Sequence, residues 1–295
     1  MNRMTFEDWA GAQRARCETL FDAWVPLSAP AGLGEAMRYA VLGGGKRLRP
    51  LLALAACEAV QGEGAAAERA AVAVELIHAY SLVHDDMPCM DNDVLRRGKP
   101  TVHVAFGEAQ AMLAGDAMQA LAFDVLTPEA DMDLALQARL CRLLARASGH
   151  AGMAGGQAID LAAIGQPLNE DQLRDMHRRK TGLLLQASVM MGAACGSPSA
   201  AETAALSTYG ADIGLAFQVV DDILDVTQDS ATLGKTAGKD QVANKPTYVS
   251  VLGLEASRRY AVQLRDEALA ALDGVPRLHS QRLRELAFQV VAREC

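Results

Sequence analysis

Apolar positions recur along most of the chain at the three- and four-residue spacing of α-helices. With helix ends placed at prolines, glycines and polar clusters, the pattern predicts helices over residues 5–25, 33–42, 50–60, 68–85, 101–126, 131–148, 151–163, 169–195, 199–226, 255–273 and 277–294. We therefore expect every regular segment to be helical. The expected architecture is a single all-α domain over residues 1–295, a bundle with a deep central cavity.

The composition agrees with close-packed helices and limits the classes of partner. Hydrophobic residues make up 51% of the chain but aromatic residues only 4%, whereas sheets favour β-branched and aromatic residues. A net charge of −8 with scattered basic groups argues against a nucleic-acid partner. The six cysteines lack CxxC spacing, which is typical of reduced thiols. We find no signal peptide and no apolar run of about 18 residues, so we expect a cytoplasmic protein without a membrane span.

Polar side chains interrupt the apolar helix that ends near residue 85. His78, Ser81 and Asp85 are spaced i, i+3 and i+7, so they share one face of that helix. The loop behind them adds acidic and basic residues, in the order Asp86, Asp91, Asp93, Arg96, Arg97 and Lys99. Carboxylates supply oxygen ligands for Mg²⁺, and guanidinium groups bind phosphate oxygens in pairs. The stretch therefore predicts a site for hard cations and phosphates.

A second apolar helix repeats this arrangement. In FQVVDDILD, residues 217–225, Gln218, Asp221 and Asp225 again occupy positions i, i+3 and i+7. A single pair of aspartates is more often part of a solvated loop, but two apolar helices that each end in such a pair are hard to explain that way. The two helices must face each other for their carboxylates to share ions, which predicts the cavity between them.

Two basic segments are suited to close contact with a ligand. In GGGKRLRP, residues 43–50, three glycines let the backbone approach a ligand closely, although the spacing is not that of a P-loop. In HRRKTG, residues 177–182, a Lys-Thr-Gly sequence lies inside an apolar helix, where glycine costs about 1 kcal/mol relative to alanine. We expect a kink there that exposes backbone carbonyl groups toward the cavity.

Taken together, these segments resemble the trans-polyprenyl diphosphate synthases, most closely the bacterial short-chain farnesyl diphosphate synthases (geranyltranstransferases). The resemblance extends from about residue 33 to 255 and rests on DDMPCMD, DDILD, GGKRLRP and the Lys-Thr-Gly segment. It implies an isoprenoid synthase bundle that forms a homodimer. It also implies a head-to-tail condensation of isopentenyl diphosphate with dimethylallyl or geranyl diphosphate, which gives farnesyl diphosphate (C15) and diphosphate.

The resemblance further implies roles for individual side chains. Isopentenyl diphosphate would be held by Lys46, Arg49, His78 and Arg97. The allylic diphosphate would be held by Arg96, Lys180, Lys235 and Lys245. The implied catalytic set, of which the last two members are neutral dipoles facing the developing carbocation, is Lys180, Thr181 and Gln218. The implied cofactor is Mg²⁺, three ions per site with Mn²⁺ as a substitute, on Asp85, Asp86, Asp91, Asp221 and Asp225.

The implied reaction proceeds by ionisation, condensation and elimination. Positive charge around the allylic diphosphate stabilises the departing anion, and apolar walls keep the carbocation from water. Because no side-chain base is evident in the apolar part of the pocket, we expect the released diphosphate to take the proton. Four nearby residues receive no chemical role. His84 is expected to be structural, Asp116 to lie at a helix-packing position, and Gln157 and Asp160 to line the pocket wall or neighbouring loops.

The length of the product depends on residues one helical turn before the first motif. An α-helix rises about 5.4 Å per turn, so a side chain at this distance from Asp85 can form a floor for the growing hydrocarbon tail. Ser81 lies directly below Asp85, and Tyr80 stands beside it. A bulky tyrosine in this position predicts C15 as the main product. Plant-like geranylgeranyl (C20) synthases share the motif spacing, so C20 is the alternative.

Two other classes of function are remoter alternatives. A class I terpene cyclase also uses an aspartate-rich motif, but it lacks a second diphosphate site of the GGKRLRP kind. A non-catalytic helical regulatory subunit would be expected to lose an aspartate motif, and both motifs are present here.

Overall fold

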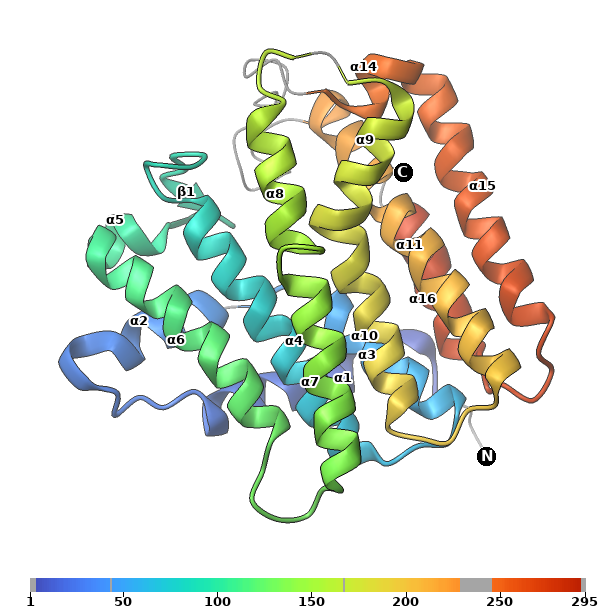
Figure 1. Cartoon of the computed structure of the whole chain (residues 1–295), viewed down its shortest axis with the longest axis horizontal. Helices are drawn as coiled ribbons and strands as arrows, with labels where there is room; N and C mark the ends of the chain where they lie inside the picture. The colour runs from blue at the N-terminus through green and yellow to red at the C-terminus, as the bar shows by residue number, and fades with distance from the viewer. Residues whose placement is uncertain (1–3, 43, 167, 229–245, 293–295) are drawn as a thin grey trace.

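The computed structural model describes residues 4–42, 44–166, 168–228 and 246–292, and this part of the chain is mainly helical (Figure 1). In chain order, the helices and strands are α1 (Phe6–Trp24), η1 (Pro30–Gly32), α2 (Leu33–Val41), α3 (Leu48–Ala59), α4 (Gly64–Asp85), β1 (Leu95–Arg96), β2 (Lys99–Pro100), α5 (Val102–Phe106), α6 (Glu108–Leu126), α7 (Leu134–Ser148), α8 (Met153–Ala162), α9 (Glu170–His177), η2 (Arg178–Gly182), α10 (Leu183–Ala194), α11 (Ala200–Thr227), α14 (Tyr248–Leu252), α15 (Leu254–Asp273) and α16 (Gln281–Ala292). The all-α fold class is thus confirmed.

Two details of the predicted elements are wrong. The helix expected over residues 101–126 is two helices, because Gly107 has φ 86° and separates α5 from α6. The expectation that every regular segment is helical also fails, since β1 and β2 form a short antiparallel pair. The pair shapes the loop after the first acidic motif. Strands of two residues are too short to produce a periodic pattern of apolar residues, so the sequence did not predict them.

Side-chain caps set the start of the two helices that carry the later motifs. Asn169 accepts a hydrogen bond from the backbone N–H of Gln172, whose side chain accepts one from the backbone N–H of Asn169. Ser199 and Glu202 form the same reciprocal cap at α11. Such caps satisfy N–H groups that have no partner inside a helix. The start of each of these helices is therefore determined by residues three positions apart in the sequence.

Helix α4 lies in the middle of the bundle and contacts α3, α6 and α10 (Figure 1). Much of its length is alanine, and its buried alanines let neighbouring helices approach from several sides. A Cβ at Gly192 of α10 would overlap the backbone of Ala53 in α3, so the glycine permits the close packing of these helices. One continuous buried core includes residues from α1 through α16.

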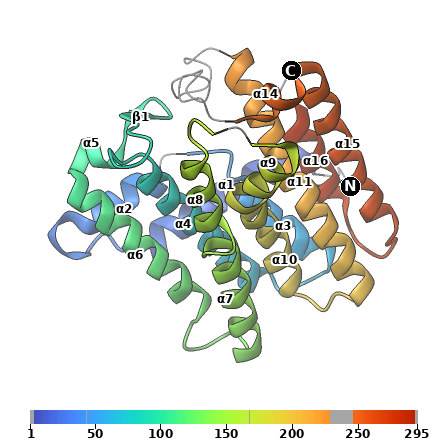
Figure 2. The ribbon, with the colours of Figure 1, turned by 45° about the horizontal axis from the view of Figure 1, so that its top comes forward.

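The carboxyl ends of α4 and α11 lie at the same end of the bundle, which Figure 2 turns toward the viewer. Both acidic motifs lie at this end, and α8 and η2, which pack against each other, are beside it. None of the helices within the described residues combines the length and the apolar character that crossing a membrane requires.

Candidate functional site

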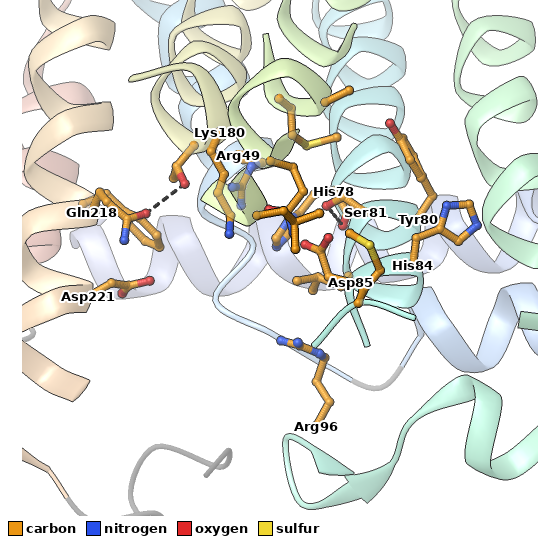
Figure 3. A pocket seen from close by; sticks show the side chains of 18 of the residues that line it. Arg49, His78, Tyr80, Ser81, His84, Asp85, Arg96, Lys180, Gln218 and Asp221 are labelled. Atoms are coloured by element: carbon orange, nitrogen blue, oxygen red, sulfur yellow. Dashed lines mark hydrogen bonds between the residues drawn. The ribbon is translucent and has the colours of Figure 1, made fainter. Parts of the chain in front are cut away.

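A cavity of about 670 Å³ lies between the motif helices and is lined by residues of both. Figure 3 shows Asp85 and Asp221 on opposite walls, with Lys180 and Arg49 pointing into the space between them. The remaining polar lining comes from His78, Tyr80, Ser81, His84, Arg96, Arg97, Gln157, Thr181 and Gln218. The apolar lining includes Met90, Met153, Leu161, Phe217 and Leu224. The structure therefore brings together most of the predicted site residues.

The loop after α4 folds back onto the end of the helix. The backbone N–H of Asp91 donates to the carbonyl of Asp85 at 2.8 Å, and that of Asp93 donates to the carbonyl of Asp86 at 3.0 Å. These bonds satisfy carbonyl groups that the helix end leaves without partners. They also bring Asp91 beside Asp85. The spacing between the two aspartates is therefore the length of chain that this turn requires.

Asp85 is in an environment that disfavours its charge. Burial raises the pKa of Asp85 to about 6, and the nearby negative charge of Asp91 adds to this effect. The charge of Lys180 opposes this rise in the pKa, and a metal ion beside the carboxylate would act in the same direction. Asp85 therefore has the electrostatic character expected of a ligand for a positive ion.

Asp86 has a different partner. Its carboxylate accepts hydrogen bonds from Arg96, from Nε at 2.8 Å and from Nη2 at 2.5 Å. Asp86 is buried and does not line the cavity, whereas Arg96 does. Sequence reasoning gave Asp86 to a metal and Arg96 to a phosphate, but here the two neutralise each other. Direct metal binding by Asp86 would require this ion pair to open.

A chain of hydrogen bonds runs from the cavity lining to the second motif and to α14. Thr181 Oγ1 donates to Gln218 Oε1 at 2.9 Å (Figure 3), and Gln218 Nε2 donates to Asp222 Oδ1 at 2.9 Å. The other oxygen of Asp222 accepts from the backbone N–H of Tyr248 at 2.8 Å. Asp222 thus orients the Gln218 amide and anchors α14, while Asp221 faces the cavity. Asp225 is buried and does not line the cavity.

The carboxylates fit a metal that is completed by substrate oxygens. Within the described residues, no three His, Cys, Asp or Glu side chains lie close enough to hold a metal by themselves. Asp85 and Asp221 instead present oxygens from opposite walls. Mg²⁺ usually binds through one or two carboxylates together with phosphate oxygens and water. The donor set therefore suits Mg²⁺ together with a phosphorylated substrate.

The expected kink at Lys-Thr-Gly is a π-helical turn, η2. Such turns are frequent at functional sites because they change which backbone groups are exposed. Lys180 Nζ lies 2.6 Å from Asp160 Oδ2 on α8. A Cβ at Gly156 would overlap the backbone of Lys180, so this glycine lets α8 lie directly against the turn. Lys180 and Thr181 both line the cavity.

A second cavity, of about 760 Å³, adjoins the first. It is lined by Lys46, Arg14, Gln289 and others, and it shares Arg49, His78, Arg97 and Phe217 with the cavity between the acidic motifs. Two spaces with a common wall can hold two ligands side by side. The wall contains both basic and aromatic side chains.

The two arginines of GGGKRLRP have separate functions. Arg47 is 4% exposed and forms ion pairs with Glu18 at 2.6 Å and Glu75 at 3.0 Å. Arg49 lines both cavities, and its buried Nε atom has no hydrogen-bond partner among the residues that the structure describes. Burial lowers the pKa of Arg49. Arg47 therefore secures the fold, whereas a buried and incompletely compensated Arg49 favours an anionic ligand.

Arg97 reaches the glycine-rich segment from the loop after the first motif. Its Nη1 donates to the carbonyl of Gly44, and its guanidinium lies against Gly45, where a Cβ would crowd it. His78 faces the same region, and burial together with the charge of Arg49 holds the pKa of His78 well below its ordinary value. His78 is thus neutral and can donate one hydrogen bond among several cationic groups.

Tyr80 and Ser81, the two residues predicted to form the floor, line the cavity on the α4 side. Tyr80 is 9% exposed, and its hydroxyl accepts a hydrogen bond from Gln119 Nε2 at 3.4 Å. Ser81 donates to the carbonyl of His78 at 2.9 Å. Figure 3 shows Tyr80 and His84 together at one side of the cavity.

Two residues of α8, which sequence reasoning expected near the pocket wall but gave no chemical role, are part of the site. Asp160 pairs with Lys180. Gln157 lines the cavity, and both of its amide atoms are buried without a hydrogen-bond partner in the described part of the chain. Gln157 and Asp160 are spaced i and i+3, so they share one face of α8, and a pair of glycines precedes them. This pattern in the sequence could have indicated a helix face that packs closely against another element. Asp116, expected at a helix contact, is exposed, and its neighbour Gly115 is buried there instead. Lys235 and Lys245 lie outside the described residues.

Comparison with known proteins finds prenyl diphosphate synthases by both family model and sequence identity. A family model described as "Polyprenyl synthetase" matches residues 30–272. The chloroplastic heterodimeric geranylgeranyl pyrophosphate synthase large subunit 1 of Arabidopsis thaliana is 50% identical over 259 residues, which cover 86% of this chain and 70% of that protein. Geranylgeranyl pyrophosphate synthase 4 of the same plant is 49% identical over 266 residues, or 88% of this chain and 71% of that protein.

Solved structures of bacterial proteins are also similar to this chain. An FPP/GFPP synthase from Zymomonas mobilis has a TM-score of 0.87 and 42% identity, covering 97% of this chain and 98% of that one. A geranyltransferase from Helicobacter pylori, complexed with magnesium and isoprenyl diphosphate, has a TM-score of 0.85 and 34% identity, covering 99% of this chain and 98% of that one. The plant and bacterial proteins have names that denote different product lengths.

Proposed function

The chain belongs to the polyprenyl synthetase family, and we propose that this head-to-tail prenyl diphosphate synthase makes mainly farnesyl diphosphate. The proposed substrates are isopentenyl diphosphate and dimethylallyl or geranyl diphosphate. The observation that carries the proposal is the pair of adjoining cavities, one with aspartates on facing walls and the other basic, with Arg49, His78 and Arg97 between them. Two diphosphates with different tasks require such an arrangement.

Mg²⁺ would be held by Asp85, Asp91 and Asp221, and when bound it neutralises the leaving diphosphate. The magnesium in the Helicobacter pylori relative supports this proposal. Asp225 is proposed as a further ligand because of its position in the motif. Asp86 is also a proposed ligand, but its main contact is the ion pair with Arg96, which would have to open for Asp86 to bind the metal. The proposed number is three ions, and Mn²⁺ is the proposed substitute.

The allylic diphosphate would bind where Lys180 and Arg96 border the carboxylate walls. Asp160 fixes the direction of the Lys180 ammonium, so the charge is already oriented when the leaving group departs. The Thr181 and Gln218 oxygens present neutral dipoles beside the carbocation, and the hydrogen bond between them fixes their orientation. A neutral dipole stabilises the cation without forming a bond to it. Lys235 and Lys245 are proposed as further phosphate ligands.

Isopentenyl diphosphate would bind in the basic cavity, with its diphosphate on Lys46, Arg49, His78 and Arg97. This places its double bond at the common wall, next to the allylic carbon. Phe217, Met153 and Leu224 exclude water from the carbocation. The proton lost after condensation would pass to the released diphosphate, because among the described residues the apolar part of the lining has no basic side chain.

The C15 product is supported by the position of Tyr80 in the cavity wall. Its ring is buried between the cavity and α6, and Gln119 contacts its hydroxyl. A C20 product is the second candidate, and it is favoured by the names of the plant relatives. The name of the Zymomonas mobilis relative supports C15 and longer products.

Product analysis tests the proposed function directly. The pure protein would be incubated with Mg²⁺, radiolabelled isopentenyl diphosphate and dimethylallyl, geranyl or farnesyl diphosphate, and the dephosphorylated products separated by chromatography. Mainly C15 from the first two primers supports the proposal. Mainly C20 supports the second candidate, cyclic hydrocarbons would indicate a terpene cyclase, and no incorporation would indicate a non-catalytic subunit.

Substitution at the floor should change product length in opposite directions. Tyr80→Ala should shift the product toward C20 or longer, because it removes a ring from the cavity wall. Ser81→Phe should stop elongation at C10, because Ser81 lies one turn below Asp85 and a phenyl ring there would fill the path of the tail. The same chromatography measures both. An unchanged product from Tyr80→Ala would place the floor elsewhere.

A homodimer and a cytoplasmic location are also proposed. Two large apolar side chains of α6 are exposed, Met112 by 40% and Leu113 by 53%. One relative is named as the large subunit of a heterodimer, which supports assembly with a second chain, here a copy of itself. Light scattering would measure the assembled mass. The five cysteines of the described residues are free, which supports a reducing compartment.

A further inference from the structure

The side chain behind Tyr80 is His84, one turn further along α4. The two ring centroids are 5.7 Å apart with the planes at 73°, an edge-to-face contact (Figure 3). Aromatic pairs in this geometry stabilise each other beyond the area they bury. His84 also borders the cavity. The position of the Tyr80 ring is therefore limited on one side by the imidazole.

His84 is itself held by α6. Its Nε2 atom lies 3.0 Å from the carbonyl oxygen of Met112. A carbonyl can only accept, so Nε2 must carry a proton and the tautomer of His84 is fixed. The hydrogen bond joins two helices and prevents the imidazole from turning away from Tyr80.

Gly115 makes the space that His84 occupies. A Cβ at this position would overlap the imidazole at Nε2, Cδ2 and Cε1. Gly115 lies inside α6, where glycine costs about 1 kcal/mol relative to alanine, so its presence there calls for a packing reason. Met112, Gly115 and Gln119 follow one another at three- and four-residue spacing on one face of α6, and together they surround the Tyr80–His84 pair.

We propose that His84 is a positioning residue for product length, which holds the Tyr80 ring in place as the floor of the cavity, and that Gly115 admits the imidazole. The inference rests on the proposed function, since it assumes that the growing tail reaches Tyr80. Without the imidazole, the phenol ring can rotate into the vacated space, and the cavity becomes deeper although Tyr80 is still present.

His84→Ala should raise the ratio of C20 to C15 product about tenfold or more, the low end of the 10–200-fold effect of one methylene in an apolar pocket. The kcat/KM for farnesyl diphosphate as primer should rise relative to that for geranyl diphosphate. His84→Phe should keep the original product length, because a ring still supports Tyr80 even without the hydrogen bond. A simple loss of stability would lower all rates together and leave the product ratio unchanged.

A double-mutant comparison separates ring displacement from general damage to helix packing. Gly115→Ala should alter the product ratio in the otherwise native chain, because the new methyl group expels the imidazole. In the His84→Ala background it should have no further effect, since no ring remains to be displaced. Gly11→Ala in α1 is the matched control, because a Cβ there meets no atom within 4 Å.

The outcomes are distinct. Equal effects of Gly115→Ala in both backgrounds would overturn the proposal, as would an unchanged product from His84→Ala when Tyr80→Ala lengthens it. In both of these cases the proposed function would stand. A native protein that makes no prenyl diphosphate would overturn the function and this inference together. If His84→Ala fails to fold, as judged by circular dichroism, Gly115→Ala decides alone, since expelling the ring must also change the product ratio.

Discussion

Alanine at Asp85 or at Asp221 should lower the turnover number by several orders of magnitude and leave the helix content unchanged. The two carboxylates lie on facing walls, so neither wall can replace the oxygens of the other. Losing one charge-assisted interaction costs about 1.5–3 kcal/mol. Removing a single stabiliser of developing negative charge lowers kcat about 10²–10³-fold. Loss of a carboxylate together with the cation that it holds should exceed both.

Steady-state turnover at several Mg²⁺ concentrations, with circular dichroism of each variant, measures this effect. Asp171→Ala is the matched control, because the Asp171 side chain is 93% exposed and lies far along the chain from both motifs. Its turnover should equal that of the native protein. Near-native turnover of either Asp85→Ala or Asp221→Ala would refute a mechanism that uses both acidic helices.

Arg49→Ala and Lys180→Ala should affect different substrates. Arg49 stands in the wall of the basic cavity with an unpartnered buried Nε, so its loss should raise the KM for isopentenyl diphosphate far more than that for the allylic primer. Lys180 borders only the first of the two cavities, so its loss should act on the allylic primer and on kcat. Truncating one member of a buried charge pair costs about 2–5 kcal/mol, which corresponds to at least tenfold in affinity.

Initial rates with one substrate varied at saturation of the other give the two KM values for each variant. Arg178→Ala is the control for Lys180, since Arg178 lies in the same η2 turn but pairs with Asp175 and does not line the cavity. It should change neither KM. Equal shifts of both KM values in Arg49→Ala and in Lys180→Ala would contradict the division of the two cavities between the two substrates.

The helices and the ends of the main motif helices could be predicted from sequence, because their signals lie within one or two turns. Apolar spacing, the caps at Asn169 and Ser199 and the glycine in Lys-Thr-Gly are all local. The same local view failed at Gly107 and at the β1–β2 pair. A glycine within a helical pattern of apolar residues does not reveal whether its φ angle is positive. Strands of two residues are too short to show an alternating pattern.

The acidic and basic motifs identified the chemistry of the site, but they did not identify which side chain serves it. Arg47 and Arg49 are two residues apart in one motif. Arg47 borders the second cavity but is paired with Glu18 and Glu75, whereas Arg49 lines both cavities. Asp85 and Asp86 are adjacent, yet Asp86 is paired with Arg96. The difference depends on which charged side chain of another element lies opposite each residue.

The sequence by itself determined the helical class, the two facing acidic motifs and the family resemblance, because periodicity and motif spacing are properties of consecutive residues. The tertiary structure decided the wall between two cavities, the pairing of Asp160 with Lys180 and the contact of His84 with Met112 and Gly115. These partners come from helices that are separate in sequence. The distances between them depend on how closely the helices pack, and the residue type at one position does not reveal which residue of another helix lies opposite it.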